Sequence, residues 1–120
     1  MRALVVDDSS AMRAVLRMIL KKQNFQVVDA KDGLDALQVL KQIEPVDLIL
    51  IDWNMPAMNG FELLQHIRAE ARFGQTKVVM VTTETALAEM SNALAAGADE
   101  YIMKPFTPDV VADKLQLMGL

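Results

Sequence analysis

The 120-residue chain contains no cysteine and only one histidine. The lack of cysteine excludes disulfides, zinc–thiolate sites and a cysteine nucleophile, and a single histidine excludes histidine-rich metal sites. The chain also lacks a large excess of either charge, because 12 basic and 16 acidic side chains give a formal net charge of −4. This mildly acidic balance predicts no direct binding of nucleic acid.

Long apolar runs are missing as well. No segment approaches the roughly 20 apolar residues of a membrane-spanning helix. The first eight residues lack the long apolar region of a signal peptide. We therefore expect a cytoplasmic protein with no membrane insertion. Hydrophobic residues still make up 52% of the sequence, which is enough to form the core of one domain over residues 1–120.

Short apolar runs alternate with longer helical patterns along the chain. The runs cover residues 3–6, 25–28, 48–51, 77–81 and 101–103. Apart from Gln26 and Lys77 these runs are apolar and do not alternate with polar residues, which indicates strands buried on both faces, as in a parallel sheet. The repeated strand–helix order predicts an α/β fold of (βα)5 type. This is a doubly wound, parallel five-stranded sheet, for which we expect the flavodoxin-like class and its strand order 2-1-3-4-5.

The helices between these strands are predicted from amphipathic patterns and capping residues. Expected helices cover residues 11–22, 33–43, 60–70, 86–96 and the segment after Thr107, with Asp32, Asn59, Thr85 and Thr107 as N-caps. Glu62 is placed to complete a capping box with Asn59. In the first helix, Arg13, Arg17 and Lys21 are expected to lie on the stripe opposite the core.

Polar residues follow the strands at their carboxyl ends. Asp7, Asp52, Thr82 and Lys104 each come directly after an apolar run. Ligands of open α/β sheets bind outside the carboxyl ends of the strands, where the strand order reverses. With the first and third strands adjacent, we expect Asp7, Asp8 and Asp52 to converge there. Thr82 and Lys104 approach from the last two strands.

Such a group of carboxylates favours a divalent cation. Two unit charges about 5 Å apart repel by about 3 kcal/mol at an effective dielectric constant of about 20. Oxygen ligands without cysteine or histidine favour Mg²⁺, Mn²⁺ or Ca²⁺, and we expect Mg²⁺ because it binds through few carboxylates and keeps several waters, with Mn²⁺ as an alternative. Lys104 and Thr82 make the site suitable for a phosphoryl group, with Asp52 as the candidate nucleophile. Each residue alone could be a helix cap or a loop residue, but their shared edge favours the functional interpretation.

Several motifs together resemble a known family. They are Val-Asp-Asp-Ser at 6–9, Asp-Trp-Asn-Met-Pro at 52–56, Asn-Gly at 59–60, Val-Thr at 81–82, Ala-Gly-Ala at 96–98 and Lys-Pro-Phe at 104–106. The chain resembles the receiver domain of two-component response regulators over essentially its whole length. Among receivers it is most similar to the single-domain regulators of chemotaxis. The resemblance implies a single receiver domain over residues 1–120.

The resemblance also implies a role for each matching residue. Asp52 matches the phosphoacceptor. Asp8 matches a direct ligand of Mg²⁺, Asp7 a ligand that acts through water, and Asn54 a position whose backbone carbonyl binds the metal. The remaining matches are Thr82 and Lys104 as partners of the phosphoryl group, Tyr101 as the switch aromatic that moves with Thr82, and Asn54, Thr83 and Glu84 as positions that tune hydrolysis. The bond before Pro105 is expected to be cis.

The function implied by this resemblance is signalling. A sensor histidine kinase would phosphorylate Asp52, and small phosphodonors could substitute for it. The protein would assist its own phosphorylation and dephosphorylation without being an enzyme, with a phosphatase as a possible partner. Phosphorylation would reshape the face of the fourth helix, fifth strand and fifth helix for a downstream protein. The candidate residues on that face are Ala88, Asn92, Ala95, Glu100, Tyr101 and Met103. We expect a monomer.

Other functions fit the sequence less well. A flavin-binding electron carrier needs a phosphate-binding loop after the first strand, where this chain has two aspartates. A phosphohydrolase of the aspartate type needs a second acid two residues after its nucleophile, and Asn54 cannot transfer a proton. A degenerate receiver that acts only as a scaffold is disfavoured because every functional position is filled. A receiver of another phosphorelay, or one excised from a larger regulator, remains an alternative. Because no DNA-binding domain follows the last predicted helix, we expect stand-alone signalling.

Overall fold

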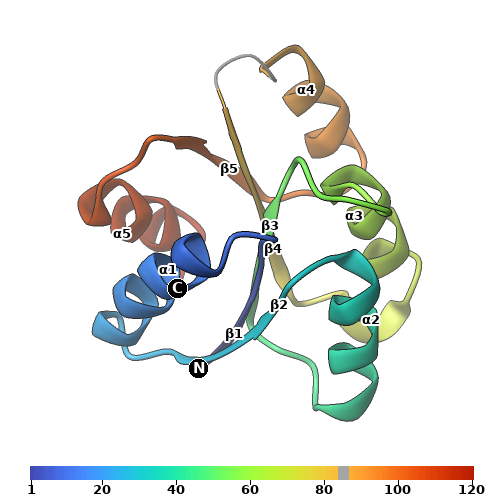
Figure 1. Cartoon of the computed structure of the whole chain (residues 1–120), viewed down its shortest axis with the longest axis horizontal. Coiled ribbons are helices and arrows are strands. Elements are labelled where there is room, and N and C mark those ends of the chain that lie inside the picture. The colour runs from blue at the N-terminus through green and yellow to red at the C-terminus, as the bar shows by residue number, and fades with distance from the viewer. Residues whose placement is uncertain (84–86) are drawn as a thin grey trace.

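The computed structural model describes residues 1–83 and 87–120. Its elements are β1 (Arg2–Val6), α1 (Ser10–Lys22), β2 (Gln26–Ala30), α2 (Gly33–Gln42), β3 (Leu48–Asp52), α3 (Gly60–Arg68), η1 (Ala71–Phe73), β4 (Lys77–Thr83), α4 (Leu87–Ala95), β5 (Glu100–Lys104) and α5 (Pro108–Leu117). All strand pairs are parallel, in the order β2-β1-β3-β4-β5. The predicted fold class and strand order are confirmed (Figure 1).

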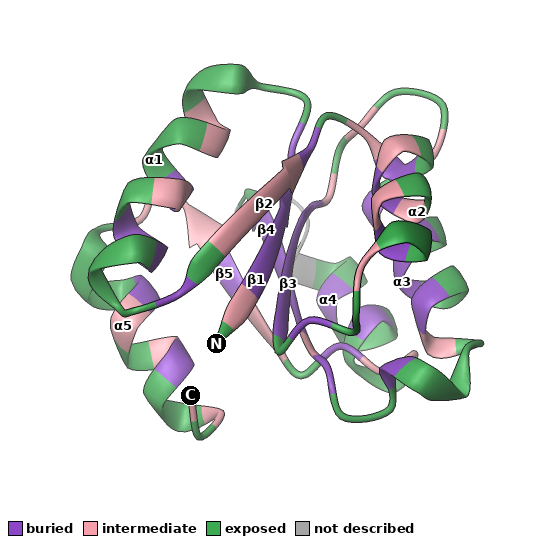
Figure 2. Cartoon of the chain, turned by 90° about the horizontal axis from the view of Figure 1, so that it is seen from below, coloured by how far each residue is buried: buried purple, intermediate pink, exposed green. Residues whose placement is uncertain are grey.

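Helices cover both faces of the sheet. Helices α1 and α5 lie on one face, and α2, α3 and α4 lie on the other (Figure 1). The inner strands β1, β3 and β4 are largely buried, with every residue of β3 buried, whereas the edge strands β2 and β5 are mostly half-buried (Figure 2). This burial on two faces explains why the central strands are continuously apolar in the sequence.

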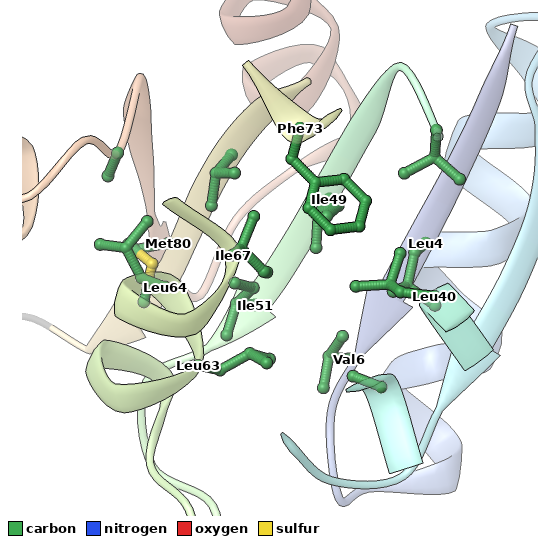
Figure 3. Packing of buried hydrophobic residues seen from close by; sticks show 14 of the residues in the cluster. Leu4, Val6, Leu40, Ile49, Ile51, Leu63, Leu64, Ile67, Phe73 and Met80 are labelled. Carbon is green, nitrogen blue, oxygen red and sulfur yellow. The ribbon is translucent and has the colours of Figure 1, made fainter. Parts of the chain in front are cut away.

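The core has two parts because successive side chains of a strand point to opposite faces of the sheet. On one side, Leu4 and Ile51 pack with residues of α2 and α3. Figure 3 shows this part, in which side chains of β1, β3 and β4 meet those of α3. On the other side, Val5 and Leu50 pack with residues of α1 and α5. Burying each large aliphatic side chain stabilises the fold by about 1.5–3 kcal/mol.

The predicted helix caps are largely confirmed. Asp32 accepts a hydrogen bond from the Asp35 amide at 2.8 Å, Thr107 accepts one from the Val110 amide at 3.3 Å, and Asn59 and Glu62 form the predicted capping box. Thr85 lies outside the described residues. The first helix begins one residue earlier than predicted, because Ser9 caps it by accepting a hydrogen bond from the Met12 amide at 3.2 Å.

Other boundaries differ from the predictions by a few residues. Strand β2 begins after Phe25 and continues to Ala30, past the predicted end at residue 28. The extension was not predicted because it contains the charged residue Asp29. This carboxylate is paired with Arg13 and Arg17 of α1, so the strand accommodates its charge. Strands β4 and β5 also extend beyond their predicted runs, and α3 ends at residue 68 instead of 70.

Candidate functional site

The register of the sheet brings the predicted polar residues to one edge. Val6 is paired with Ile51, so the chain leaves β1 beside Asp52, the last residue of β3. Between β4 and β5, Thr83 is opposite Lys104. Side chains that are up to 97 residues apart in the sequence therefore meet where the strands end.

Three carboxylates form a compact cluster at this edge. One oxygen each of Asp7, Asp8 and Asp52 lies within 4.8 Å of the others. Asp7 is only 1% exposed and Asp52 only 7%, whereas Asp8 is exposed to solvent. The structure thus brings the three predicted metal ligands together, with an open side at Asp8.

Asp7 is held by both its main chain and its side chain. Its amide donates to the carbonyl of Ala30 at 3.2 Å, which continues the β1–β2 ladder by one residue. Its Oδ1 accepts a hydrogen bond from the Ser9 amide at 2.8 Å, and its Oδ2 lies 3.5 Å from Lys104 Nζ. One contact close in sequence and one distant contact therefore hold this carboxylate in the cluster.

Lys104 connects the cluster to the far end of the sheet. Its Nζ donates to Asp52 Oδ1 at 2.9 Å and contacts Asp7 as well. The peptide bond from Lys104 to Pro105 is cis, as the family resemblance implies. The Lys104 ammonium offsets only one of the three carboxylate charges, which leaves two negative charges at the site without a positive partner.

Burial and like charges act against ionisation of Asp52. Desolvation raises the pKa of its carboxyl above the ordinary value of 3.8, and the carboxylates of Asp7 and Asp8 raise it further. The hydrogen bond from Lys104 lowers this pKa but does not outweigh burial. Burial also lowers the pKa of Lys104, yet its contacts with Asp52 and Asp7 outweigh that effect and raise the pKa above 10.5. Lys104 is therefore positively charged at neutral pH.

The loop after β3 returns close to Asp52 at a glycine. The Gly60 amide donates to the carbonyl of Trp53 at 2.9 Å. A Cβ atom added to Gly60 would lie 2.5 Å from the main-chain oxygen of Asp52. In the sequence, Gly60 is both part of the Asn-Gly motif and the first residue of a predicted helix. The Asn-Gly motif was the available signal, but the close approach that requires glycine exists only in the fold.

The remaining predicted site residues differ in burial. Thr82 is buried, and its hydroxyl donates to the carbonyl of Thr83 at 3.4 Å. Asn54 and Thr83 are exposed. Glu84, the other predicted tuning position, lies outside the described residues.

The predicted partner surface spans α4, β5 and α5. Ala88, Asn92 and Ala95 are exposed on α4, and Glu100, Tyr101 and Met103 are half-buried on β5. Lys114 of α5 joins this surface: its Nζ lies 3.1 Å from Glu100 Oε1 and 4.8 Å from the centre of the Tyr101 ring. The contact between the Lys114 ammonium and the Tyr101 ring was not predicted from the sequence.

One expectation about α1 is wrong. Arg13 was predicted to lie on the solvent-facing stripe with Arg17 and Lys21. Its side chain is only 20% exposed, and its guanidinium donates to the main-chain carbonyl of Asp7 at 2.7 Å. The helical pattern could not show this contact because it depends on how α1 packs beside the end of β1.

Comparison with known proteins agrees with this architecture. Residues 3–116 match the response regulator receiver domain family. A chemotaxis protein CheY homolog of Campylobacter jejuni is 44% identical over 117 residues, which cover 97% of this chain and 90% of the relative.

Two solved structures are also similar. The chemotaxis response regulator CheY4 of Vibrio cholerae has a TM-score of 0.90 and 33% identity, covering 98% of this chain and 97% of that one. A putative two-component system response regulator/GGDEF domain protein has a TM-score of 0.91 and 27% identity, covering 98% of this chain but 48% of that one. Receiver domains bind Mg²⁺ at an acidic pocket, and in this chain Asp7, Asp8 and Asp52 form an acidic cluster that could hold a metal ion. The chain belongs to the response regulator receiver domain family.

Proposed function

We propose that this protein is a phosphorylation-activated response regulator that accepts a phosphoryl group on Asp52 from a sensor histidine kinase. The observation that carries this proposal is the placement of Asp52 among two further carboxylates with Lys104 Nζ 2.9 Å from its Oδ1. A nucleophilic carboxylate beside a fixed cation is suited to phosphoryl transfer, because the negative charge of the phosphoryl oxygens needs a positive partner.

The donor set fits Mg²⁺, with Mn²⁺ as an alternative. All the side-chain ligands are oxygens, and the cluster lacks two positive charges after Lys104 is counted. The residues that would hold the ion are Asp7, Asp8 and Asp52, with the backbone carbonyl of Asn54. When bound, the ion supplies positive charge that offsets the carboxylates and the phosphoryl oxygens.

The side chains of this protein would do the rest of the chemistry. A carboxylate oxygen of Asp52 forms a bond to phosphorus as the bond from phosphorus to the histidine nitrogen of the kinase breaks. Lys104, already beside that carboxylate, neutralises charge on the transferred group. The Thr82 hydroxyl donates to the phosphoryl group in place of the Thr83 carbonyl. The later hydrolysis of the acyl phosphate is tuned by Asn54, Thr83 and Glu84, and a phosphatase can assist it.

Phosphorylation would act on the α4–β5–α5 surface through Thr82 and Tyr101. A phosphoryl group adds about −1.5 to −2 charge and strong acceptor oxygens. When Thr82 moves toward these oxygens, Tyr101 can fill the space behind it. Couplings of this kind are typically about 1–3 kcal/mol, so the expected result is a population shift that favours a downstream partner.

The biological setting we propose is chemotaxis. The similarity to a CheY homolog over nearly its full length and to the CheY4 structure supports this setting. We further propose that residues 1–120 act as a single cytoplasmic receiver domain, monomeric and without enzymatic turnover of its own. The described helices include none long and apolar enough to cross a membrane. A receiver within a longer regulator is the second candidate, favoured by the similarity to part of a GGDEF-containing protein.

The direct test is intact mass spectrometry after incubation with a small phosphodonor. We expect the gain of one labile phosphoryl group in the presence of Mg²⁺, and no gain with EDTA or in Asp52→Asn. Transfer from a phosphorylated histidine kinase should label the same residue. Labelling that persists in Asp52→Asn would show that another residue accepts the phosphoryl group.

A further inference from the structure

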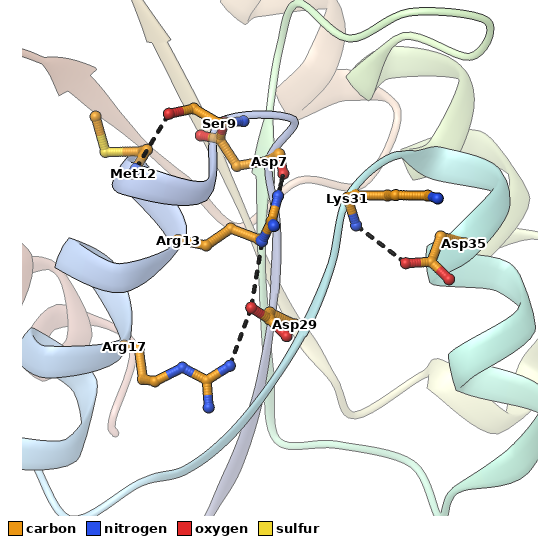
Figure 4. A network of polar contacts seen from close by, with 8 residues as sticks. All are labelled: Asp7, Ser9, Met12, Arg13, Arg17, Asp29, Lys31 and Asp35. Atoms are coloured by element: carbon orange, nitrogen blue, oxygen red, sulfur yellow. Dashed lines mark hydrogen bonds and ion pairs between the residues drawn. The ribbon is translucent and has the colours of Figure 1, made fainter.

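Arg13 links the acidic cluster to the neighbouring strand β2. Its Nε donates to Asp29 Oδ2 at 3.2 Å, and its Nη1 donates to the main-chain carbonyl of Asp7 at 2.7 Å (Figure 4). The side chain is 20% exposed, so these contacts are shielded from much of the solvent. One planar guanidinium thus connects α1, the end of β1 and β2.

The Asp7 carbonyl lies just past the end of β1, where the neighbouring strands β2 and β3 no longer both provide hydrogen-bond partners. Asp7 follows the last paired residue of β1, Val6, although its amide still reaches Ala30 of β2. Arg13 supplies a donor to the carbonyl at this point. Because that carbonyl belongs to the peptide unit that joins Asp7 to Asp8, the same bond restrains the direction in which both carboxylates leave the strand.

We propose that Arg13 is a positioning residue for the divalent cation: it fixes the peptide between Asp7 and Asp8 so that their carboxylates face Asp52 before the ion binds. This inference rests on the proposed metal site described above. Partners that orient the ligands of a metal commonly change its affinity by about 10- to 100-fold when they are removed. Arg13 acts in this way through the main chain instead of through a ligand side chain.

The positioning role and the charge of Arg13 predict opposite results. Replacing Arg13 by a neutral residue removes a positive charge near three carboxylates, and charge alone would then tighten the binding of a cation. Loss of positioning would weaken it. A weaker affinity in a variant that has become more negative therefore separates the two effects.

Arg17 offers a matched control. Its guanidinium lies 2.9 Å from the same Asp29 oxygen, so Arg17→Ala removes the same charge from the same ion-pair network. Within the described residues, Arg17 makes no hydrogen bond to Asp7. The two alanine variants thus differ in whether the bond to the Asp7 carbonyl is lost (Figure 4).

The experiment is isothermal titration of Mg²⁺ into the parent protein, Arg13→Ala, Arg13→Lys and Arg17→Ala, with thermal unfolding of each in EDTA. We expect the dissociation constant to rise about tenfold in Arg13→Ala and to stay within about twofold in Arg17→Ala. Arg13→Lys keeps the charge but lacks the fork that spans Asp29 and Asp7, and we expect it to weaken binding about threefold.

The outcomes separate this inference from the proposed function. Parent-like or tighter binding by Arg13→Ala would overturn the positioning role, as would an equal loss in Arg17→Ala. If Arg13→Ala does not fold in EDTA, Arg13→Lys decides, and parent-like affinity in that variant would also overturn it. A parent protein that binds no Mg²⁺ would instead overturn the proposed metal site, whatever the variants do.

Discussion

Lys104 Nζ lies 2.9 Å from Asp52 Oδ1, although the two residues end strands that are not neighbours in the sheet. Strand β4 lies between β3 and β5, so the lysine side chain reaches across it to the acidic cluster. The tertiary structure therefore places the Lys104 ammonium beside Asp52, a carboxylate whose pKa is raised by burial. This relationship has consequences for both reactivity and stability.

Removal of the Lys104 cation should slow phosphorylation. We expect Lys104→Gln to lower the rate of phosphoryl transfer from a small phosphodonor by about 100-fold, because a fixed donor to developing charge is lost. The measurement is the rate of mass gain at saturating Mg²⁺. Lys77→Gln is the control. Lys77 is the first residue of β4, at the end of the strand away from the acidic cluster, so this change should leave the rate unchanged. Equal rates in parent and Lys104→Gln would contradict the role given to Lys104.

The raised pKa of Asp52 predicts how stability depends on pH without metal. The folded protein holds the Asp52 proton more tightly than the unfolded chain does. The free energy of unfolding gained from this tighter proton binding is therefore fully present below the ordinary pKa of 3.8. It is lost as the pH rises through the raised pKa of Asp52 in the folded protein. Above that folded value the ionised carboxylate is unfavourable, and we expect Asp52→Asn to raise the free energy of unfolding there by about 1 kcal/mol. Urea unfolding in EDTA measures this change.

Asp99 provides the contrasting control for that experiment. Its Oδ2 accepts hydrogen bonds from Arg68 at 2.9 Å and from the Val78 amide at 2.8 Å. Asp99→Asn should therefore destabilise the protein by about 1–3 kcal/mol, because a charge-assisted contact is weakened. Destabilisation of both variants at pH 7 would show that Asp52 is stabilised by Lys104 more than it is disfavoured by burial.

Mg²⁺ should stabilise the fold through the acidic cluster. A ligand at 100 times its dissociation constant adds about 2.7 kcal/mol to the free energy of unfolding when it binds only the folded state. We expect this gain in the parent and little of it in Asp8→Asn at the same Mg²⁺ concentration. Asp113→Asn, an exposed change on α5, should respond like the parent. A full Mg²⁺ effect in Asp8→Asn would remove Asp8 from the ligand set.

The glycine beside the phosphoacceptor should not tolerate a methyl group. In Gly60→Ala the new Cβ would lie 2.5 Å from the Asp52 carbonyl oxygen and 3.0 Å from Met80 Cε. The main chain would have to move, so we expect a loss of about 1–3 kcal/mol in stability together with slower phosphorylation. Gly74→Ala is the control, because its nearest neighbour is the Ala71 carbonyl oxygen at 3.2 Å. Urea unfolding and the mass assay together report both effects.

Much of the fold followed from local sequence patterns. Strand β3 is buried along its whole length, and such a strand needs an apolar run that is visible without any structure. The caps at Asp32 and Asn59 are contacts between residues three apart, so the sequence contains both partners. Strand β2 was predicted less well because Asp29 is neutralised by arginines on another element.

The sequence by itself determined the succession of strands and helices along the chain, because that succession depends on short-range periodicity. It also determined which polar residues follow the strands at their carboxyl ends. Only the tertiary structure decided three contacts of the site: the approach of Lys104 to Asp52, the bond from Arg13 to the Asp7 carbonyl, and the lack of space at Gly60. The packing of separate elements sets each of these distances, so local sequence patterns do not predict them.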